Sequence, residues 1–372
     1  MSLLLGHPPK LCVRKPVLVR ASPLLSNGIS SSSVQTPPCY ILGAKQCEAY
    51  VGKLMIVNAN DRKCICTYLD KKVPLDLVYN HPYNEMVKIG SSHGWVATLR
   101  YDGILRLQDD LNPVASDSDP KRISLPPLVT LPHCQTQIIT NVSMSAPSPE
   151  EEDCVVAVKF LGPQLSFCRP AAQCNPEWIN IRIANPCFFS SRVMFSKKDD
   201  MFCILGSGGD IIGSWDLRKH KHTPKLQKLQ FQNLPELKNT TLEVLSSCCC
   251  TIEHLVESRC TGETFLVKQY KKTAEIVDGI AKMKTEALMV FKLDGEGNAV
   301  YTQDIGDLSI FLSNSEPFCV PPSTFPGMFR NTVYIFDFDE LGFFDLSKDN
   351  YVGAFSTPST MFPYFIPPQK ID

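Results

Sequence analysis

The sequence predicts an all-β protein, a single β-propeller of six or seven four-stranded blades. Three observations predict this fold: a hairpin pattern that recurs along the chain, a spacing between hairpins that matches a propeller blade, and the lack of a long amphipathic helix. Each hairpin consists of two apolar or aromatic runs joined by a turn rich in Gly, Asp, Asn or Pro. We expect the propeller to cover residues 48–365 and a short tail, 366–372, to follow it.

Seven hairpins follow one another along the chain. In order they contain "LMIVNANDRKCICTYL", "GWVATLRYDGILRL", "VVAVKFLGPQLSFC", "MFCILGSGGDIIGSW", "LVESRCTGETFLVKQY", "ALMVFKLDGEGNAVYT" and "TVYIFDFDELGFFDL". Their turns fall near residues 60, 102, 162, 208, 261, 296 and 341, with an average spacing near 47 residues. Four-stranded blades repeat at about 40–50 residues, so this is the period of a propeller.

Two features could argue against a propeller. Residues 272–286, "KTAEIVDGIAKMKTE", interrupt the series and could hold a short helix or an insertion in a blade. A β-sandwich would also accommodate the hairpins, but sandwiches seldom extend past about 250 residues as one domain. The length of 372 residues therefore favours the propeller.

The first 47 residues have the composition of an organelle transit segment. They contain no Asp or Glu, they include a serine run, and their positive charge comes from Lys10, Arg14, Lys15, Arg20 and Lys45. A positive segment without acids is drawn to import receptors and across a negative-inside membrane potential. We expect residues 1–47 to be disordered and cleaved, and the protein to reside in the mitochondrion. The chloroplast and a disordered cytosolic tail are the alternatives.

Overall composition narrows the function only slightly. With 37 Lys and Arg against 38 Asp and Glu, the net charge of -1 gives no general attraction to nucleic acid or anionic membranes. No apolar run approaches the ~18–20 residues of a membrane-spanning helix, which predicts a soluble protein. The 16 cysteines are scattered, and neither Cys64 with Cys66 nor the run 248–250 has the spacing of a structural zinc site. We expect reduced, buried thiols and no metal or other cofactor.

The stretch "SSHGWVA" holds the histidine that most resembles a catalytic residue. His93 precedes Gly94 and Trp95 at the start of a predicted strand, and no acid or nucleophile motif accompanies it. We therefore expect His93 to hydrogen-bond a neighbouring turn, with Trp95 packing between blades.

Other motifs also favour ordinary structure over chemistry. The pair Trp215-Asp216 occurs once and lacks the Gly-His partner of a WD repeat, so we interpret it as a strand end. Residues 206–210, "GSGGD", lack the spacing of a phosphate-binding loop and fit a hairpin turn. The carboxylates of Asp337, Asp339 and Glu340 fail the calcium-loop pattern, although a looser cation site at a blade turn is an alternative. No motif predicts a catalytic, cofactor-binding or metal-binding residue.

Several quoted stretches together resemble a known family. "SSHGWVA", "LNPVASDSDPKRISLPPL" (residues 111–128), "GSWDL" and "FCVPPSTFPGMFRNTVYI" are similar to the plant F-box-associated β-propeller family of unknown function, also called the KIB-type family. The likeness runs from about residue 50 to 350. "VVAVKFLGPQLSFCRP", "GETFLVKQYKK" and "YTQDIGDLSIFLSNSEPFCVP" look closer still to its organelle-targeted branch. This resemblance implies an organelle protein without the F-box, and hence no contact with a ubiquitin ligase scaffold.

These observations favour a non-enzymatic interaction module with an unknown protein partner. A propeller places many variable loops at one rim while its strands hold them rigidly. Two alternatives stay open. Residues 218–228, "RKHKHTPKLQK", could attract organelle RNA through Lys219, Lys221 and Lys225. An enzyme could instead use the central channel, if polar groups with shifted pKa values converge there.

Overall fold

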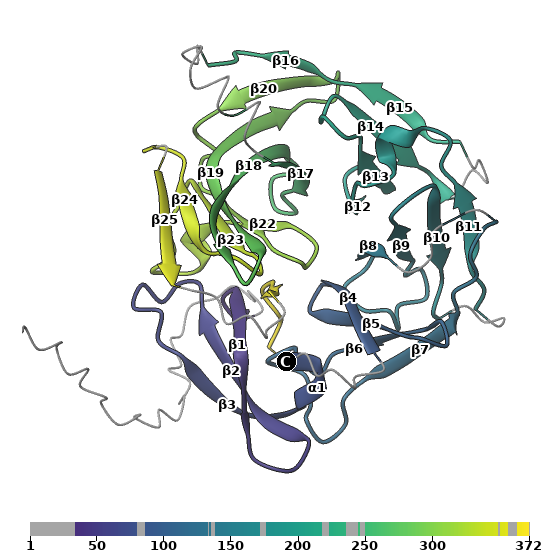
Figure 1. The fold of residues 1–372 in the computed structure, drawn as a ribbon, viewed down its shortest axis with the longest axis vertical. Coiled ribbons are helices and arrows are strands. Elements are labelled where there is room, and N and C mark those ends of the chain that lie inside the picture. Colours follow the sequence, from purple (N-terminus) through teal and green to yellow (C-terminus); the bar gives the residue numbers. More distant parts are fainter. Residues whose placement is uncertain are drawn as a thin grey trace, which may run out of the picture.

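Six β-sheets surround a central axis as the blades of a propeller (Figure 1). The computed structural model describes residues 34–79, 86–132, 134, 138–171, 176–217, 223–235, 245, 250–348, 350–355 and 363–371. The predicted all-β propeller is therefore confirmed, with six blades. No helix in these ranges is long and apolar enough to cross a membrane.

Blades one to four are regular four-stranded sheets whose strands follow one another from the axis outward. Blade one contains β1 (Cys39–Gln46), β2 (Val51–Asn58), β3 (Thr67–Pro74) and, next to the axis, β26 (Phe365–Ile366). A four-residue helix, α1 (Leu75–Val78), follows β3. Blade two contains β4 (Met86–Ser92), β5 (Trp95–Arg100), β6 (Ile104–Gln108) and β7 (Arg122–Pro127). Blade three contains β8 (Ile139–Met144), β9 (Val156–Phe160), β10 (Gln164–Cys168) and β11 (Ile179–Arg182). Blade four contains β12 (Val193–Ser196), β13 (Met201–Leu205), β14 (Ile211–Trp215) and β15 (Lys225–Lys228). A 3-10 turn, η1 (Pro186–Phe188), links blades three and four.

Blades five and six each have five strands. Blade five contains β17 (Cys250–Glu257), β18 (Thr264–Val277), β19 (Ile280–Leu293) and β20 (Asn298–Thr302), with β16 (Gln230–Gln232) added in parallel at its outer edge. Blade six contains β21 (Ser309–Leu312), β22 (Phe318–Val320), β23 (Thr332–Phe336), β24 (Leu341–Asp345) and β25 (Asn350–Phe355), and a second 3-10 turn, η3 (Pro322–Thr324), follows β22. Because β21 pairs with β23, β22 is an extra strand on the axis side of its blade.

The two ends of the propeller meet in blade one. Phe365 pairs with Tyr40 in an antiparallel ladder, and nearer the two chain ends Gln35 forms a bridge with Lys370. The boundaries expected at residues 47 and 366 are therefore corrected, because strand β1 and residues 366–371 belong to the fold. The acid-free composition of residues 39–44 reflects a strand that buries most of its side chains.

The seven predicted turns all separate paired antiparallel strands, yet there are six blades. Two of these turns, near residues 261 and 296, lie in the same sheet, where they join β17 to β18 and β19 to β20. The spacing of 35 residues between them was the shortest of the series. The ambiguity between six and seven blades came from this doubled hairpin.

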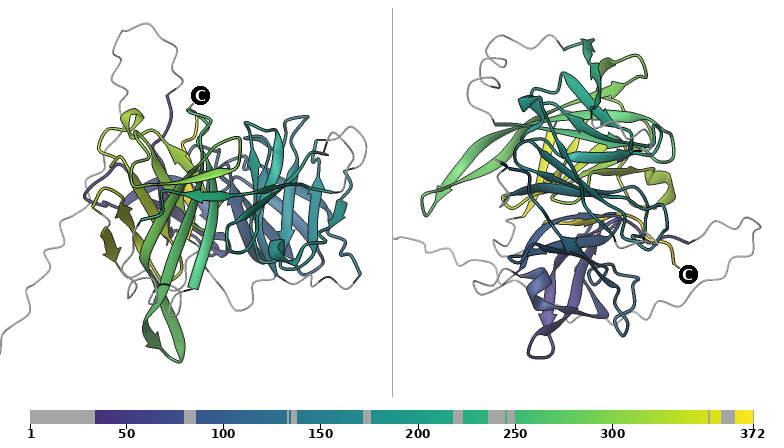
Figure 2. Two further views of the ribbon diagram at one scale, coloured as in Figure 1. Left: turned by 90° about the horizontal axis from the view of Figure 1, so that it is seen from above. Right: turned by 90° about the vertical axis from the view of Figure 1, so that its right-hand side faces the viewer.

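Residues 272–286 form no helix; they are the outer part of one long hairpin. Strands β18 and β19 pair over 14 residues each, and Figure 2 shows this green hairpin projecting beyond the other blades. Asp278 and Gly279 both have positive φ, of 50° and 77°, which is the geometry of a two-residue type I′ turn. The segment is therefore an insertion in a blade, one of the two expected alternatives.

Apolar side chains fill the spaces between neighbouring blades. Buried residues from blades two and three pack together around Trp95, Met144 and Phe160, and similar clusters lie between the other blades. Between blades six and one, Phe311 stacks on Phe318 with ring centroids 4.8 Å apart and meets Phe365 edge to face. The core is thus a ring of interblade layers.

The twelve cysteines in the described ranges are all free. Cys39, Cys154, Cys168, Cys203 and Cys319 are buried, and burial raises the pKa of Cys154 to about 11. The expectation of buried thiols is confirmed for these five, whereas Cys47, Cys64, Cys250 and Cys260 are exposed.

Candidate functional site

A loop from blade six crosses the centre of the propeller. Residues 313–317 connect β21 to the extra strand β22, and we call them the axial loop. Its backbone is tied to blades one and two: the Asn314 amide donates to the Pro363 carbonyl at 3.0 Å, and the Glu316 amide donates to the Ser91 carbonyl at 2.6 Å. These bonds hold the loop against the inner strands.

The carboxylate of Glu316 also contacts blade two and joins two further blades, three and four, at this point. It accepts hydrogen bonds from the Ser92 hydroxyl at 2.5 Å, from the Ser143 hydroxyl at 2.6 Å and from the Phe195 amide at 3.4 Å. Those donors lie on β4, β8 and β12. Burial raises the pKa of Glu316, and the two serine hydrogen bonds oppose that rise only in part.

A half-buried arginine closes the other side of the axial loop. Arg192 donates from Nη1 to the Ser313 carbonyl at 2.8 Å and from Nη2 to Asn314 Oδ1 at 3.3 Å. The Glu316 carboxylate and the Arg192 guanidinium group are therefore bonded at the axis, whereas the buried Ser91 Oγ has no hydrogen-bond partner among the described residues. The axial loop ties blade six to blades one, two, three and four.

Replacing Glu316 by glutamine tests the protonation of this carboxyl group. Because its pKa is raised in the folded state, the folded chain binds more protons than the unfolded chain above about pH 4.5. The wild type should therefore lose stability relative to Glu316→Gln as the pH rises from 4.5. Urea unfolding of both proteins from pH 4.5 to 8 measures this difference, and parallel pH profiles would contradict it.

His93 lies in the two-residue turn between β4 and β5, with φ of 54°. The guanidinium group of Arg259, in the turn after β17, approaches both ring nitrogens, with Nη1 3.0 Å from Nδ1 and Nη2 2.6 Å from Nε2. Burial, followed by the charge of Arg259, lowers the pKa of His93 well below its usual value. His93 therefore contacts a turn, as expected, but this turn belongs to blade five and not to a neighbouring blade. Trp95 packs between blades two and three as expected, and donates to the Pro147 carbonyl at 3.1 Å.

The acidic run in blade six holds lysine side chains. Asp337 and Glu340 contact Lys271 Nζ of blade five at 2.5 and 2.9 Å, and Asp339 contacts Lys282 at 3.2 Å. Burial alone would lower the pKa of Lys271, but the two carboxylates raise it overall. The cation at this blade turn is therefore an ammonium group of the chain itself, and no metal-binding cluster occurs among the described residues.

The other sequence motifs have the expected structural roles. Trp215 is the last residue of β14, is 1% exposed, and meets Phe188 edge to face. Gly208 and Gly209, with φ of 93° and 71°, form the turn between β13 and β14. In the basic stretch, Lys225 and Lys228 lie on the outer strand β15, whereas residues 218–222, with Lys219 and Lys221, lie outside the described residues.

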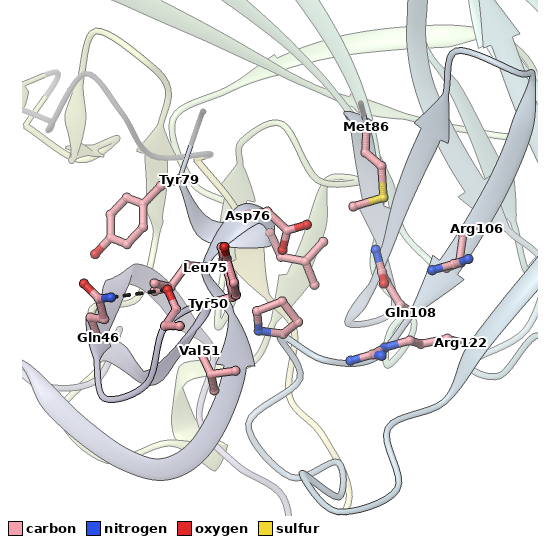
Figure 3. A pocket seen from close by; sticks show the side chains of 13 residues that line it. Gln46, Tyr50, Val51, Leu75, Asp76, Tyr79, Met86, Arg106, Gln108 and Arg122 are labelled. Atoms are coloured by element: carbon pink, nitrogen blue, oxygen red, sulfur yellow. Dashed lines mark hydrogen bonds between the residues drawn. The ribbon is translucent and has the colours of Figure 1, made fainter. Parts of the chain in front are cut away.

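A pocket of about 850 Å³ opens between blades one and two (Figure 3). Blade one contributes its largely apolar side, with Tyr50, Val51 and Leu75. Blade two contributes a polar wall with Arg106 and Arg122 (Figure 3), which lie on the paired strands β6 and β7. The volume falls within the range of about 300–1,000 Å³ that is usual for ligand pockets.

The walls of this pocket are fixed by hydrogen bonds. The Tyr79 hydroxyl donates to the Ala44 carbonyl at 2.8 Å, which joins the residue after α1 to strand β1. In the same region Lys71 of β3 donates to the Ala115 carbonyl of blade two at 2.6 Å, and burial lowers its pKa. The two blades that form the pocket are therefore held together by a buried lysine.

The two arginines of the pocket differ in their partners. Arg122 forms a bidentate pair with the buried Asp110, with Nε–Oδ2 and Nη2–Oδ1 distances of 3.1 and 2.7 Å. The half-buried side chain of Arg106 has neither an ion pair nor a hydrogen bond within the part of the chain that the structure describes. Among the described residues, Arg106 is thus the pocket cation without an ion pair, and the pocket also contains the carboxylate of Asp76, whose charge acts on Arg122.

Sequence reasoning missed both sites. Glu316 stands in "SNSEPF", which has no motif, and its partners Ser92 and Ser143 are more than 170 positions away. Arg106 sits in the alternating pattern of "ILRL", where a charged residue normally faces solvent. The one clue to the axial site was the geometry of the predicted propeller, because the inner strands of different blades converge at the axis and polar residues on them are expected to meet there.

Comparison with protein families identifies the chain. The family model described as KIB1-4 beta-propeller matches residues 25–356, which is most of the sequence. The chain belongs to the KIB1-4 beta-propeller family. The match includes all the strands of this KIB1-4 beta-propeller except β26, and it confirms the resemblance expected from the quoted motifs. No curated protein matches the chain.

Solved structures share only a remote likeness with this KIB1-4 beta-propeller. Dihydro-heme d1 dehydrogenase NirN in complex with DHE is 12% identical, with 90% of this chain and 75% of that chain covered and a TM-score of 0.34. A puromycin hydrolase mutant complexed with PGG is 10% identical, covering 74% and 47%, with a TM-score of 0.30. BBS1N in complex with ARL6DN is 13% identical, covering 73% and 83%, with a TM-score of 0.27. These values carry no argument about function.

Proposed function

We propose that this KIB1-4 beta-propeller is a non-enzymatic protein-interaction module that acts in the mitochondrion. The observation that carries the proposal is the axial loop, because it occupies the place where a propeller enzyme would bind its substrate. The Glu316 carboxylate and the Arg192 guanidinium group there are engaged with other groups of the chain. The blades then serve to hold surface features rigidly for a protein partner.

The resemblance to the organelle-targeted branch and the acid-free N-terminal segment support the proposed location. The chloroplast is the alternative destination.

Import into isolated mitochondria and chloroplasts tests the location. The full-length chain is compared with a chain lacking residues 1–33, which leaves strand β1 intact; removal of residues 1–47 would delete that strand. We expect a protease-protected product in mitochondria for the full-length chain only. Protection in chloroplasts alone, or equal protection of both chains, would overturn the proposed location.

Co-purification tests the interaction module itself. The tagged chain is recovered from its organelle under mild crosslinking, and the retained proteins are identified by mass spectrometry. We expect one or a few proteins to recur across replicates at amounts comparable to the bait. Recovery of the bait alone would overturn the interaction module.

Two alternatives rest on particular residues. The enzyme alternative rests on the convergence of Ser92, Glu316 and His93 near the axis, but His93 contacts Arg259 and not a nucleophile. Turnover that is lost in Glu316→Gln would favour it. The RNA alternative rests on residues 218–228 and predicts binding that collapses between low and physiological salt, and that weakens when Lys219, Lys221 and Lys225 become Glu.

A further inference from the structure

The pocket between blades one and two has a polarity that indicates its occupant. Most of its lining is apolar or aromatic. Of its charged members, Arg122 pairs with Asp110 and is also acted on by the Asp76 carboxylate, whereas Arg106 has no ion pair or hydrogen bond among the described residues. A half-buried guanidinium group favours a carboxylate, because it can donate two parallel hydrogen bonds to the two oxygens. The matching ligand is therefore one that combines a carboxylate with an apolar group.

Arg122 makes the polar wall rigid beside Arg106. Its bidentate pair with Asp110 fixes the guanidinium group in place, because Asp110 is itself buried. Two of the five donors of Arg122 are used in that pair, so three donors stay available. A carboxylate bound by Arg106 would meet a second, preorganised cation.

The opposite wall suits the side chain of a protein segment. Tyr50 is 84% exposed at the rim, and Val51, Pro74 and Leu75 continue the apolar lining from it. An exposed aromatic ring at the rim of an apolar pocket is typical of a protein-binding surface. The 850 Å³ volume accommodates more than a single side chain.

Within the framework of the proposed function, we infer that this pocket binds a linear segment of a partner protein in which an acidic residue adjoins a large apolar residue. The carboxylate pairs with Arg106 beside Arg122, and the apolar side chain packs against Tyr50 and Leu75. The chain's own residues 1–33 do not fit, because they carry Lys and Arg but no Asp or Glu. Other basic import segments are excluded for the same reason.

A peptide-binding assay tests the inference. The probe is a fluorescein-labelled peptide of about ten residues with one Glu-Phe pair in a Gly-Ser background, and binding is followed by fluorescence anisotropy. We expect the Gln-Phe peptide to bind about tenfold or more weakly, since it lacks the charge. Affinity for the Glu-Phe peptide should fall as salt is added.

Charge reversal in the pocket assigns the binding to it. Arg106→Glu should remove the affinity for the Glu-Phe peptide and create affinity for a Lys-Phe peptide. The matched control is Lys198→Glu, an exposed cation in the turn after β12. Equal urea unfolding midpoints for Arg106→Glu and Lys198→Glu would show that Arg106→Glu folds. We expect this result because the Arg106 side chain has no ion pair or hydrogen bond among the described residues.

Several outcomes would overturn the inference. Equal binding of the Glu-Phe and Gln-Phe peptides would do so, as would unchanged binding by Arg106→Glu. Binding of free phenylacetate or of an oligonucleotide in place of the peptide would assign the pocket to another ligand class. If partner proteins still co-purify with Arg106→Glu as with the wild type, the pocket assignment fails while the interaction module stands.

Discussion

Glu340→Ala is expected to lower the free energy of unfolding by about 3–5 kcal/mol, because it removes one of the two carboxylates that pair with a buried ammonium group. Lys271 Nζ lies 2.9 Å from Glu340 Oε1, and the two side chains are 4% and 1% exposed. The same carboxylate accepts from the Thr285 amide and hydroxyl, both at 2.8 Å, and from Gln269 at 3.1 Å. The variant removes all these acceptors at once.

Urea unfolding of Glu340→Ala should be compared with that of Glu275→Ala. Glu275 is exposed in the outer part of the β18–β19 hairpin, so its replacement should change stability by at most about 0.5 kcal/mol. A double variant, Lys271→Met with Glu340→Gln, should lose less than the sum of the two single variants, since it removes both charges of the buried Lys271–Glu340 pair together and leaves only the half-buried Asp337 without its lysine. Similar losses for Glu340→Ala and Glu275→Ala would show that the cluster does not hold blades five and six together.

Lys159→Ala is expected to lower the free energy of unfolding by about 3 kcal/mol or more. Lys159 is 0% exposed, and its ammonium group donates to the carbonyls of Phe160, of Gly162 at 3.0 Å and of Phe189 at 2.9 Å. These bonds tie the hairpin turn of blade three to the connection that leads to blade four. Alanine removes the donor and leaves a cavity, whereas Lys198→Ala on the surface should have almost no effect.

The pH dependence of Lys159 separates its charge from its packing. Burial lowers the pKa of Lys159 from 10.5 to about 7, so the unfolded chain binds more protons than the folded chain between those two pH values. Relative to Lys159→Met, the wild type should become more stable as the pH rises from 7 to 10, by up to about 1.4 kcal/mol per pH unit. A flat difference over this range would mean that the three carbonyls keep the ammonium group charged.

The sequence predicted what depends on local pattern. Alternating apolar runs and turns such as Asp102-Gly103 identified the strands, because a hairpin is specified by residues that are neighbours in the chain. The same reasoning placed the GSGGD turn and Trp215 correctly. It treated Asp278-Gly279 as part of a helix or insertion, although this dipeptide is a strong hairpin signal and forms a type I′ turn.

The candidate sites could not be predicted because their residues lie in different blades and come together only when the blades pack into the ring. Glu316, Ser143 and Ser92 come from three blades, and nothing in their local sequence specifies that each inner strand turns its hydroxyl or carboxyl group to the axis. The boundary predicted at residue 47, between the N-terminal segment and the propeller, was wrong for a related reason. Strand β1 gains its inner neighbour only from residues 365–366, at the opposite end of the fold.

This closure imposes an order on assembly. The first three strands of blade one leave the ribosome early, but the strand that completes their sheet is synthesised after every other strand of the propeller. Until then the inner edge of β1 presents unpaired amide and carbonyl groups that another chain could join. A nascent chain is therefore an open arc with a reactive edge, and chaperones that guard such edges should hold it until synthesis ends.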